Sequence, residues 1–277
     1  MPERPAIRPA RADDLGRLGP LYEQAGFGAR LAGVVGFAKA RLDGEVVVAE
    51  AGGELVGVAA GAVFAGTGWI GGVAVVPAHR RAGLGGALTE AIVAFLADRG
   101  VATVLLHATA LGRPVYERLG FVPETAYLTL TGPTLPRSAR GPRVRPGRAA
   151  DLEAVVALDG AVTGEDRRRL LTALWPAGGL VAAADGRPLG YHLASPWRSG
   201  GATIATDTAS GLALLDAVRA VPGDEVSLSV PAANATAVEF LEAAGFAERY
   251  RTVRMHRGPG VAWDPAALFG AHNLFWG

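Results

Sequence analysis

A glycine-rich segment between an apolar strand and an apolar helix is the first part of the chain whose residue types could do chemistry. Glycine lets backbone N–H groups converge on an anion, and the start of a helix adds partial positive charge. Two arginines beside these groups could screen further negative charge. The segment therefore predicts a pyrophosphate-binding turn. It comprises Val73, Ala74, Val75, Pro77, Arg80, Arg81, Ala82, Gly83, Leu84, Gly85 and Gly86.

A second segment places proton-transfer groups after the next expected strand. His107 lies in that strand, and Tyr116 lies one helical turn before Gly120 and Phe121. A tyrosine can donate a proton, and the unperturbed pKa of histidine, near 6.5, suits a base. Each residue also has a structural interpretation, as a core aromatic on an amphipathic helix and as a structural strand histidine. Glu117 is expected to be solvated.

Together the two segments resemble the Gcn5-related N-acetyltransferase (GNAT) superfamily. Its acetyl-CoA signature Arg-x-x-Gly-x-Gly is matched by Arg80, Gly83 and Gly85, and its Tyr-x-x-x-Gly-Phe signature by Tyr116, Gly120 and Phe121. A narrower resemblance is to the tandem YitH-like proteins of this superfamily. It is carried by Ala-Thr-x-x-Gly-x-Pro-x-Tyr at residues 108–116 and by a second, degenerate half that ends in Arg254-Met255 and a glycine-rich tail.

The resemblance implies direct acetyl transfer from acetyl-CoA, as co-substrate and without a metal, to a primary amine. A small molecule is favoured over a protein as the amine. Residues 73–75 would pair with the pantetheine arm, and the amides of residues 81–86 would hold the pyrophosphate. Tyr116 would protonate the leaving thiolate. Thr109, which could donate a hydrogen bond, stands where many members have asparagine, and Gly71 and Gly72 stand where many have a glutamate base. The general base is therefore unidentified, with His107 as one candidate.

The missing glutamate keeps a second function open, that of a non-catalytic acyl-CoA-binding or sensory protein. Several other classes are excluded. The chain has no cysteine, and its single lysine, Lys39, follows no glycine-rich loop. Thiol nucleophiles, cysteine-bound metals and Walker-A sites therefore do not fit. A hydrolase lacks support because neither Gly-x-Ser-x-Gly nor His-Glu-x-x-His is present.

An internal repeat sets the domain organisation. Residues 7–15 match residues 144–152 in type at most positions, 53–57 match 186–190, and Gly120-Phe121 recurs as Gly245-Phe246. Matches in the same order predict two tandem GNAT-like domains, at 1–132 and 143–277, joined by a linker at 133–142. Each domain is expected to be a mixed α/β fold, with a mostly antiparallel sheet flanked by helices.

The second copy lacks the predicted chemistry. Because Ile70 aligns with Ile204 but Gly120 aligns with Gly245, this copy is nine residues shorter in between, and no Arg/Gly turn precedes its helix. Leu241 replaces Tyr116. Three polar residues of this copy could instead line an acceptor pocket or be structural groups of the sheet. The C-terminal tail contains five residues with aromatic rings, too many for a free tail. It is therefore expected to dock on a domain or on a second copy of the chain. The polar residues are Tyr191, His192 and Asp207, and the tail residues are Trp263, Phe269, His272, Phe275 and Trp276.

Overall composition narrows the partners and the location. The net charge is +1 and half of the 277 residues are hydrophobic. A buried core is therefore expected, with no nucleic-acid partner. Residues 55–78 carry no charge, but their glycines and Pro77 favour two buried strands over a membrane span. The N-terminal residues lack the apolar run of a signal peptide, so the protein is expected to be cytoplasmic.

Overall fold

The computed structural model describes residues 5–136, 143–197, 200–220 and 225–277. The chain forms two compact units, each mixed α/β with mostly antiparallel strand pairing, as the sequence predicts. Unit 1 contains Met1–Val122, Met255–Gly260 and Trp276; unit 2 contains Pro123–Arg254, Val261–Phe275 and Gly277. The two units are defined by contacts between residues, whereas the expected domains are defined by repeated sequence motifs. The domain limits 1–132 and 143–277 therefore stay a prediction. Most of the expected linker, residues 137–142, lies outside the described residues.

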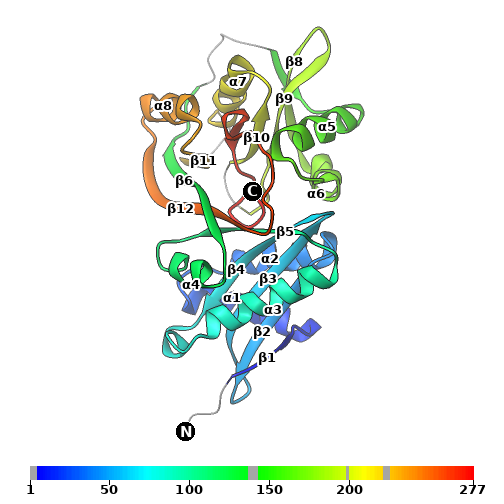
Figure 1. Cartoon of the computed structure of the whole chain (residues 1–277). Helices are drawn as coiled ribbons and strands as arrows, with labels where there is room; N and C mark the ends of the chain where they lie inside the picture. Colours follow the sequence, from blue (N-terminus) through cyan, green and yellow to red (C-terminus); the bar gives the residue numbers. More distant parts are fainter. Residues whose placement is uncertain (1–4, 137–142, 198–199, 221–224) are drawn as a thin grey trace. The chain divides into compact units, whose positions relative to one another are not determined.

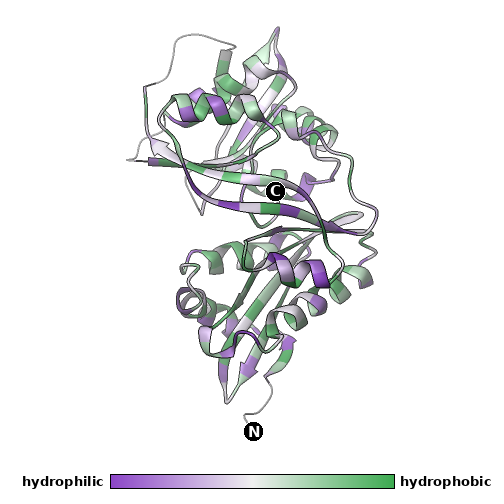
Figure 2. Ribbon diagram, turned by 60° about the vertical axis from the view of Figure 1, so that its left-hand side comes forward, coloured by the Kyte–Doolittle hydropathy of each residue, from purple (hydrophilic) through white to green (hydrophobic). Residues whose placement is uncertain are grey.

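The sheet of unit 1 runs in the order β1-β2-β3-β4-β5, followed by the last residues of β12 (Ala247–Arg257). Every pair up to β4 is antiparallel, and β4 and β5 are parallel. The strands are β1 Ala6–Pro9, β2 Glu45–Ala51, β3 Glu54–Phe64, β4 Thr67–Val75 and β5 Thr103–Ala108. The uncharged residues 55–78 thus form two buried strands, as predicted, and Figure 2 shows their hydrophobic colouring. None of the described helices is long and apolar enough to cross a membrane.

Three glycines of the sheet determine how closely helix α3 (Leu84–Asp98) approaches it. Figure 1 shows α3 across one face of the sheet, with α1 (Ala12–Gln24) and α2 (Leu31–Arg41) on the other. A Cβ added to any of the three glycines would come within 3 Å of an α3 side chain, so only glycine allows this packing. The pairs are Gly57 with Leu88 at 2.9 Å, Gly61 with Ile92 at 2.7 Å and Gly68 with Leu96 at 2.8 Å.

Unit 2 repeats this plan with two groups of strands. One sheet has the order β13-β10-β9-β8-β7, and β6 pairs with β11 on one side and neighbours β12 on the other. The strands are β6 Val122–Pro133, β7 Arg143–Pro146, β8 Gly179–Ala184, β9 Arg187–Ala194, β10 Gly201–Ala205, β11 Glu225–Pro231 and β13 Leu268–Gly270. The helices are α5 Leu152–Thr163, α6 Arg168–Leu174, α7 Thr208–Val218 and α8 Ala235–Ala243. Helix α7 contacts β8, β9 and β10, as α3 contacts β2, β3 and β4 in unit 1.

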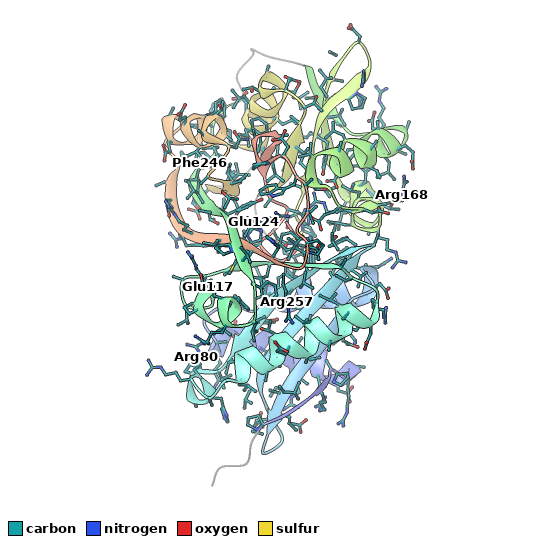
Figure 3. All side chains as sticks on the ribbon, in the orientation of Figure 1. Arg80, Glu117, Glu124, Arg168, Phe246 and Arg257 are labelled. Atoms are coloured by element: carbon teal, nitrogen blue, oxygen red, sulfur yellow. The ribbon has the colours of Figure 1, made fainter. Side chains whose placement is uncertain are left out.

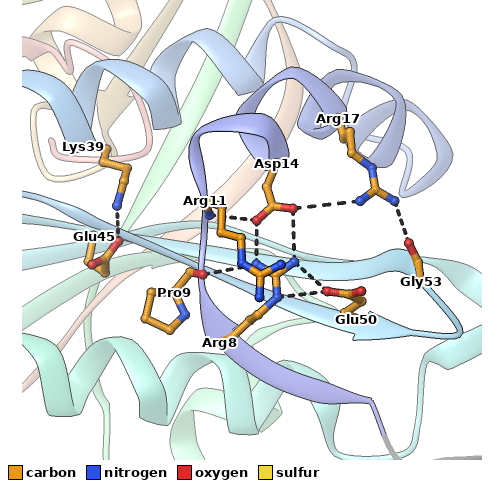
Figure 4. A network of polar contacts seen from close by, with 9 residues as sticks. All are labelled: Arg8, Pro9, Arg11, Asp14, Arg17, Lys39, Glu45, Glu50 and Gly53. Atoms are coloured by element: carbon orange, nitrogen blue, oxygen red, sulfur yellow. Dashed lines mark hydrogen bonds and ion pairs between the residues drawn. The ribbon is translucent and has the colours of Figure 1, made fainter.

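The repeated sequence motif has the same bonding pattern in both units. In unit 1 the Asp14 carboxylate accepts two hydrogen bonds from the Arg8 guanidinium, at 2.6 and 3.1 Å, and one from the Arg11 amide at 2.8 Å (Figure 4). In unit 2 Asp151 accepts the corresponding bonds, each 2.7 Å long, from Arg145 and the Arg148 amide. Each aspartate therefore holds the strand that begins its copy of the repeat, β1 or β7, to the helical segment that follows. The duplication is visible in side-chain geometry as well as in sequence.

We predict that Asp14→Asn destabilises the protein by about 1–3 kcal/mol, because Arg8 loses the more buried of its two carboxylate partners and keeps only Glu50. Hydrogen bonding from Arg8 lowers the pKa of Asp14 from 3.8 to about 2. A lowered pKa gives stability that is full above the ordinary pKa and is lost as the pH falls towards 2. The difference in unfolding free energy between wild type and variant should therefore shrink over that range. Chemical denaturation at several pH values measures it.

Asp13→Asn is the matched control, because Asp13 lies in the same first turn of α1 but is exposed. This variant should differ from wild type by less than about 0.5 kcal/mol. Equal losses for the two variants would show that the helix dipole, rather than the contact with Arg8, gives Asp14 its effect.

Candidate functional site

Strand β4 departs from β5 halfway along its length. The ladder between the two strands runs from Thr67 and Thr103 to Ile70 and Leu106, and no later pair joins them among the described residues. On its other edge β4 stays paired with β3, but with a bulge between the partners of Val58 and Ala60. The backbone of residues 71–75 therefore has no ladder partner on the β5 side, although β4 itself remains fixed by β3. Val73, Ala74 and Val75 lie on this stretch.

Gly72 lies in the bulge and has a positive φ of 58°, which glycine adopts without strain. The phenol of Tyr22, on α1, donates a hydrogen bond of 2.9 Å to the Gly72 carbonyl. Tyr22 is fully buried, and burial raises its pKa well above the ordinary value, so it stays a donor. Tyr22 is not among the site residues predicted from the sequence. No local pattern marks it, since its partner is fifty residues away.

The predicted anion-binding turn leads directly into α3. After a single 3-10 turn at Pro77–His79, Arg81 has a φ of 65°, and Gly83, the N-cap residue just before α3, has a φ of 80°. The first helical bond is donated by Ala87 to the Gly83 carbonyl. Within the described chain the structure gives no acceptor to the backbone amides that precede it. They belong to Arg81, Ala82, Gly83, Leu84, Gly85 and Gly86.

The glycines of this turn face open space. A Cβ on Gly83 would meet no atom within 4 Å, one on Gly85 would meet only Val75 at 3.9 Å, and one on Gly86 only Val115 at 3.7 Å. Packing within the protein therefore does not require glycine at positions 85 and 86. Amides without acceptors around open space fit a bound pyrophosphate.

Arg80 has a different place from the one that its sequence position suggests. Its guanidinium donates to the Val75 carbonyl and the Ala25 carbonyl, each at 2.8 Å, and so joins the end of β4 to the residue after α1. Arg80, labelled beside this turn in Figure 3, is exposed, as is Arg81. Screening of pyrophosphate charge by the two arginines stays a prediction. The structure adds a positioning role for Arg80.

Tyr116 lies on α4 (Arg113–Arg118), close to the backbone of Gly112. A Cβ on Gly112 would be 3.0 Å from the Tyr116 ring, and the Phe121 ring packs edge-on with its centroid 6.0 Å away. Burial raises the pKa of Tyr116 to about 12. A phenol with a raised pKa stays protonated at neutral pH and can act as a proton donor.

The other predicted residues near Tyr116 have local partners. The Thr109 hydroxyl accepts a 3.2 Å bond from the Gly112 amide and so shapes the turn that begins α4. Glu117 pairs with Arg113 at 2.7 Å on the exposed side of α4, in agreement with the solvated position expected for it. His107, on β5, stacks on the buried indole of Trp69 with centroids 5.3 Å apart. Its role as a base stays a prediction.

The polar residues singled out in the second half are structural groups of unit 2. The Tyr191 phenol donates to Asp159, which pairs with Arg167 at 2.6 Å, and all three side chains are buried. His192 bonds Thr203 at 2.9 Å, and burial lowers its pKa to about 4. Asp207 caps α7. Among the described residues no cluster of His, Asp and Glu could hold a metal ion.

Solved structures share this fold along nearly the whole chain. A candidate acetyltransferase from Pyrococcus horikoshii is 21% identical with a TM-score of 0.83, over 99% of this chain and 96% of that one. A GCN5-related N-acetyltransferase from Sphaerobacter thermophilus is 21% identical with a TM-score of 0.67, over 94% and 98%. A tandem GNAT protein from the clavulanic acid biosynthesis pathway is 16% identical with a TM-score of 0.64, over 93% and 99%. Identities this low show the fold alone.

Family models give the assignment that the structural likenesses do not. No curated protein sequence matches the chain significantly. Two family models, each described as an acetyltransferase (GNAT) domain, match residues 42–123 and residues 155–270. The first match contains the turn before α3 and Tyr116, and the second covers most of the repeated half. The chain therefore belongs to the GNAT acetyltransferases and carries two GNAT domains in tandem.

Proposed function

We propose that unit 1 is an N-acetyltransferase that moves the acetyl group of acetyl-CoA directly to a primary amine. Membership of the GNAT acetyltransferases supports an acyltransferase. The observation that carries the finer proposal is the run of backbone amides at residues 81–86 that have no acceptor in the described chain, beside the open edge of β4. A molecule with a pyrophosphate and an extended arm that contains amides satisfies both features.

The chain would hold acetyl-CoA through its backbone. The amides of residues 81–86 would bind the pyrophosphate, and the edge of β4 at residues 73–75 would pair with the pantetheine amides. Thr109 would contact the arm near the start of α4. The same strand amides would fix the thioester carbonyl, which favours transfer because the reacting atoms are held in place and the developing negative charge is stabilised.

The chemical step needs a neutral amine and a proton donor. The amine nitrogen attacks the carbonyl carbon, the carbon–sulfur bond breaks, and the departing thiolate takes the proton of the Tyr116 phenol. His107 is the candidate for accepting the proton that the amine loses. As acceptor we propose a small molecule rather than a protein.

One observation favours a second function, a non-catalytic acyl-CoA sensor. At Gly71 and Gly72 there is no side chain to act as a base, and the group bonded to the Gly72 carbonyl is a buried phenol whose pKa is raised. Calorimetry with acetyl-CoA, combined with thiol release in the presence of a panel of amines, separates the two functions. Binding without turnover for any amine would favour the sensor.

We predict that Gly85→Asp weakens acetyl-CoA binding by about 100-fold, because the new carboxylate would repel the pyrophosphate. The same change should leave thermal stability equal or slightly higher. Position 85 is in the first turn of α3, where a carboxylate favours the helix dipole by about 0.3–1 kcal/mol. Isothermal titration and thermal unfolding measure the two effects.

Ala235→Asp is the matched control for this substitution. It adds the same charge to the first turn of α8 at an exposed position in unit 2, and should leave acetyl-CoA affinity unchanged. Equal affinity of wild type and Gly85→Asp would place the pyrophosphate elsewhere.

We predict that Tyr116→Phe lowers kcat by about 10²–10⁴-fold with little change in the Kd of acetyl-CoA, because the phenol acts on the leaving thiolate and not on binding. The pKa of Tyr116 is raised to about 12, so its proton-donating form is present below that pH. The kcat of the wild type should therefore not decline between about pH 8 and 10, where an ordinary tyrosine starts to ionise. Thiol release against pH measures this, and a variant with wild-type kcat would remove Tyr116 from the mechanism.

A further inference from the structure

Unit 2 retains the framework of the proposed acetyl-CoA site. By the sequence repeat, β10 corresponds to β4, α7 to α3, β11 to β5 and α8 to α4, and Asn234 stands where Thr109 stands in unit 1. One piece of chain contacts all four elements. It consists of residues 264–271, here called the tail segment, which includes a 3-10 turn at Pro265–Ala267 and strand β13.

The tail segment separates β10 from β11. Strand β13 pairs antiparallel with β10, with Thr203 opposite Gly270 and Ile204 opposite Leu268. On its other side the Ala271 amide donates a 2.7 Å bond to the Ser229 carbonyl of β11. In unit 1 the corresponding strands pair directly at Trp69–Leu105 and Ile70–Leu106 before they part. The tail segment thus lies between β10 and β11. It separates these strands even at Thr203 and Ile204, whose counterparts in β4 still pair directly with β5.

Asn234 binds the tail segment through its side chain. Its amide nitrogen donates to the carbonyls of Ala266 and Leu268, at 2.9 and 3.1 Å, while its oxygen accepts a 3.0 Å bond from the Ala237 amide and so caps α8. The side chain is buried. Its bonds hold the 3-10 turn and the first residue of β13 against the start of α8. Thr109, at the equivalent position in unit 1, is exposed.

The start of α7 carries a side-chain cap that α3 does not have. The Asp207 carboxylate accepts a 2.8 Å bond from the Ser210 amide, so a side chain of the protein takes the place of a bound anion. The Phe269 ring packs against Gly211 in the same turn of α7, so closely that a Cβ on Gly211 would be 2.3 Å from ring atoms. Phe269 is buried in the core of unit 2. Among the described residues, only the amides of Thr208 and Ala209 in this turn have no acceptor, against six at the start of α3.

We infer that the tail segment is a built-in substitute for the extended co-substrate. It occupies the place between β10 and β11 that corresponds to the proposed co-substrate site of unit 1, here called the second cleft. The backbone of residues 266–271 pairs with the protein as the pantetheine arm is proposed to do in unit 1, and Asp207 replaces the phosphate. The occupant of this cleft is therefore the chain itself. The inference does not depend on catalysis by unit 1, since every contact that carries it lies within unit 2.

A double-mutant cycle between Gly211 and Phe269 tests the inference. Glycine to alanine within a helix normally stabilises a protein, because alanine has the higher helix propensity. We predict the reverse for Gly211→Ala, a fall in Tm of about 3 °C or more, since the new Cβ pushes against the Phe269 ring. In a Phe269→Ala background the same substitution should leave Tm unchanged or raise it. Gly36→Ala on α2 is the control, because a Cβ there meets no atom within 4 Å.

Hydrogen exchange on the intact protein supplies a readout if Phe269→Ala does not fold, in which case Phe269→Leu takes its place in the cycle. Saturating acetyl-CoA should slow exchange at residues 81–86 and leave residues 208–211 and 264–271 unchanged. Two results would overturn the inference. One is a rise in Tm for Gly211→Ala in both backgrounds. The other is faster exchange of the tail segment when acetyl-CoA binds.

Discussion

The ladder between β4 and β5 ends at Ile70 and Leu106, and the proposed chemistry of unit 1 depends on that end. Beyond it, a bulge fixed by Gly72 and the Tyr22 phenol turns β4 away while β3 keeps it in the sheet. The sheet glycines bring α3 close, so its uncapped first turn follows immediately after the open edge. A strand edge and a helix start, each with backbone groups that have no partner in the described chain, thus follow one another along the chain, and we propose that they bind the ligand together.

The two units show two ways of satisfying such backbone groups. Both keep the bond between an arginine of the strand that begins the repeat and an aspartate of the helical segment that follows (Arg8 and Asp14, Arg145 and Asp151). Unit 1 leaves its edge and helix start available to a ligand. Unit 2 fills both with its own residues, Asp207 at the helix and β13 at the strand. Buried polar groups need partners, so a copy that gives up its ligand must supply replacements from the chain.

Local patterns predicted what is local. Residue type and spacing were enough to predict the glycine turn before α3, the helix that bears Tyr116 and the α/β class. They also predicted the strand and helix that begin each copy of the repeat. The structure contains all of these elements. What depends on distant pairing was not predictable. Gly72 was interpreted only as an absent base, whereas its positive φ serves the bulge. The aromatic tail was expected to dock, but its position between β10 and β11 depends on strand pairing across more than sixty residues, which no periodicity in the sequence encodes.

The central claim is that the chain contains two copies of one site, of which one accepts acetyl-CoA and the other is filled by the protein. The most direct test is the stoichiometry of acetyl-CoA binding to the intact chain, measured by isothermal titration calorimetry. We expect one equivalent per chain. Two equivalents would contradict the closure of the second cleft, and no binding would contradict the assignment of the first.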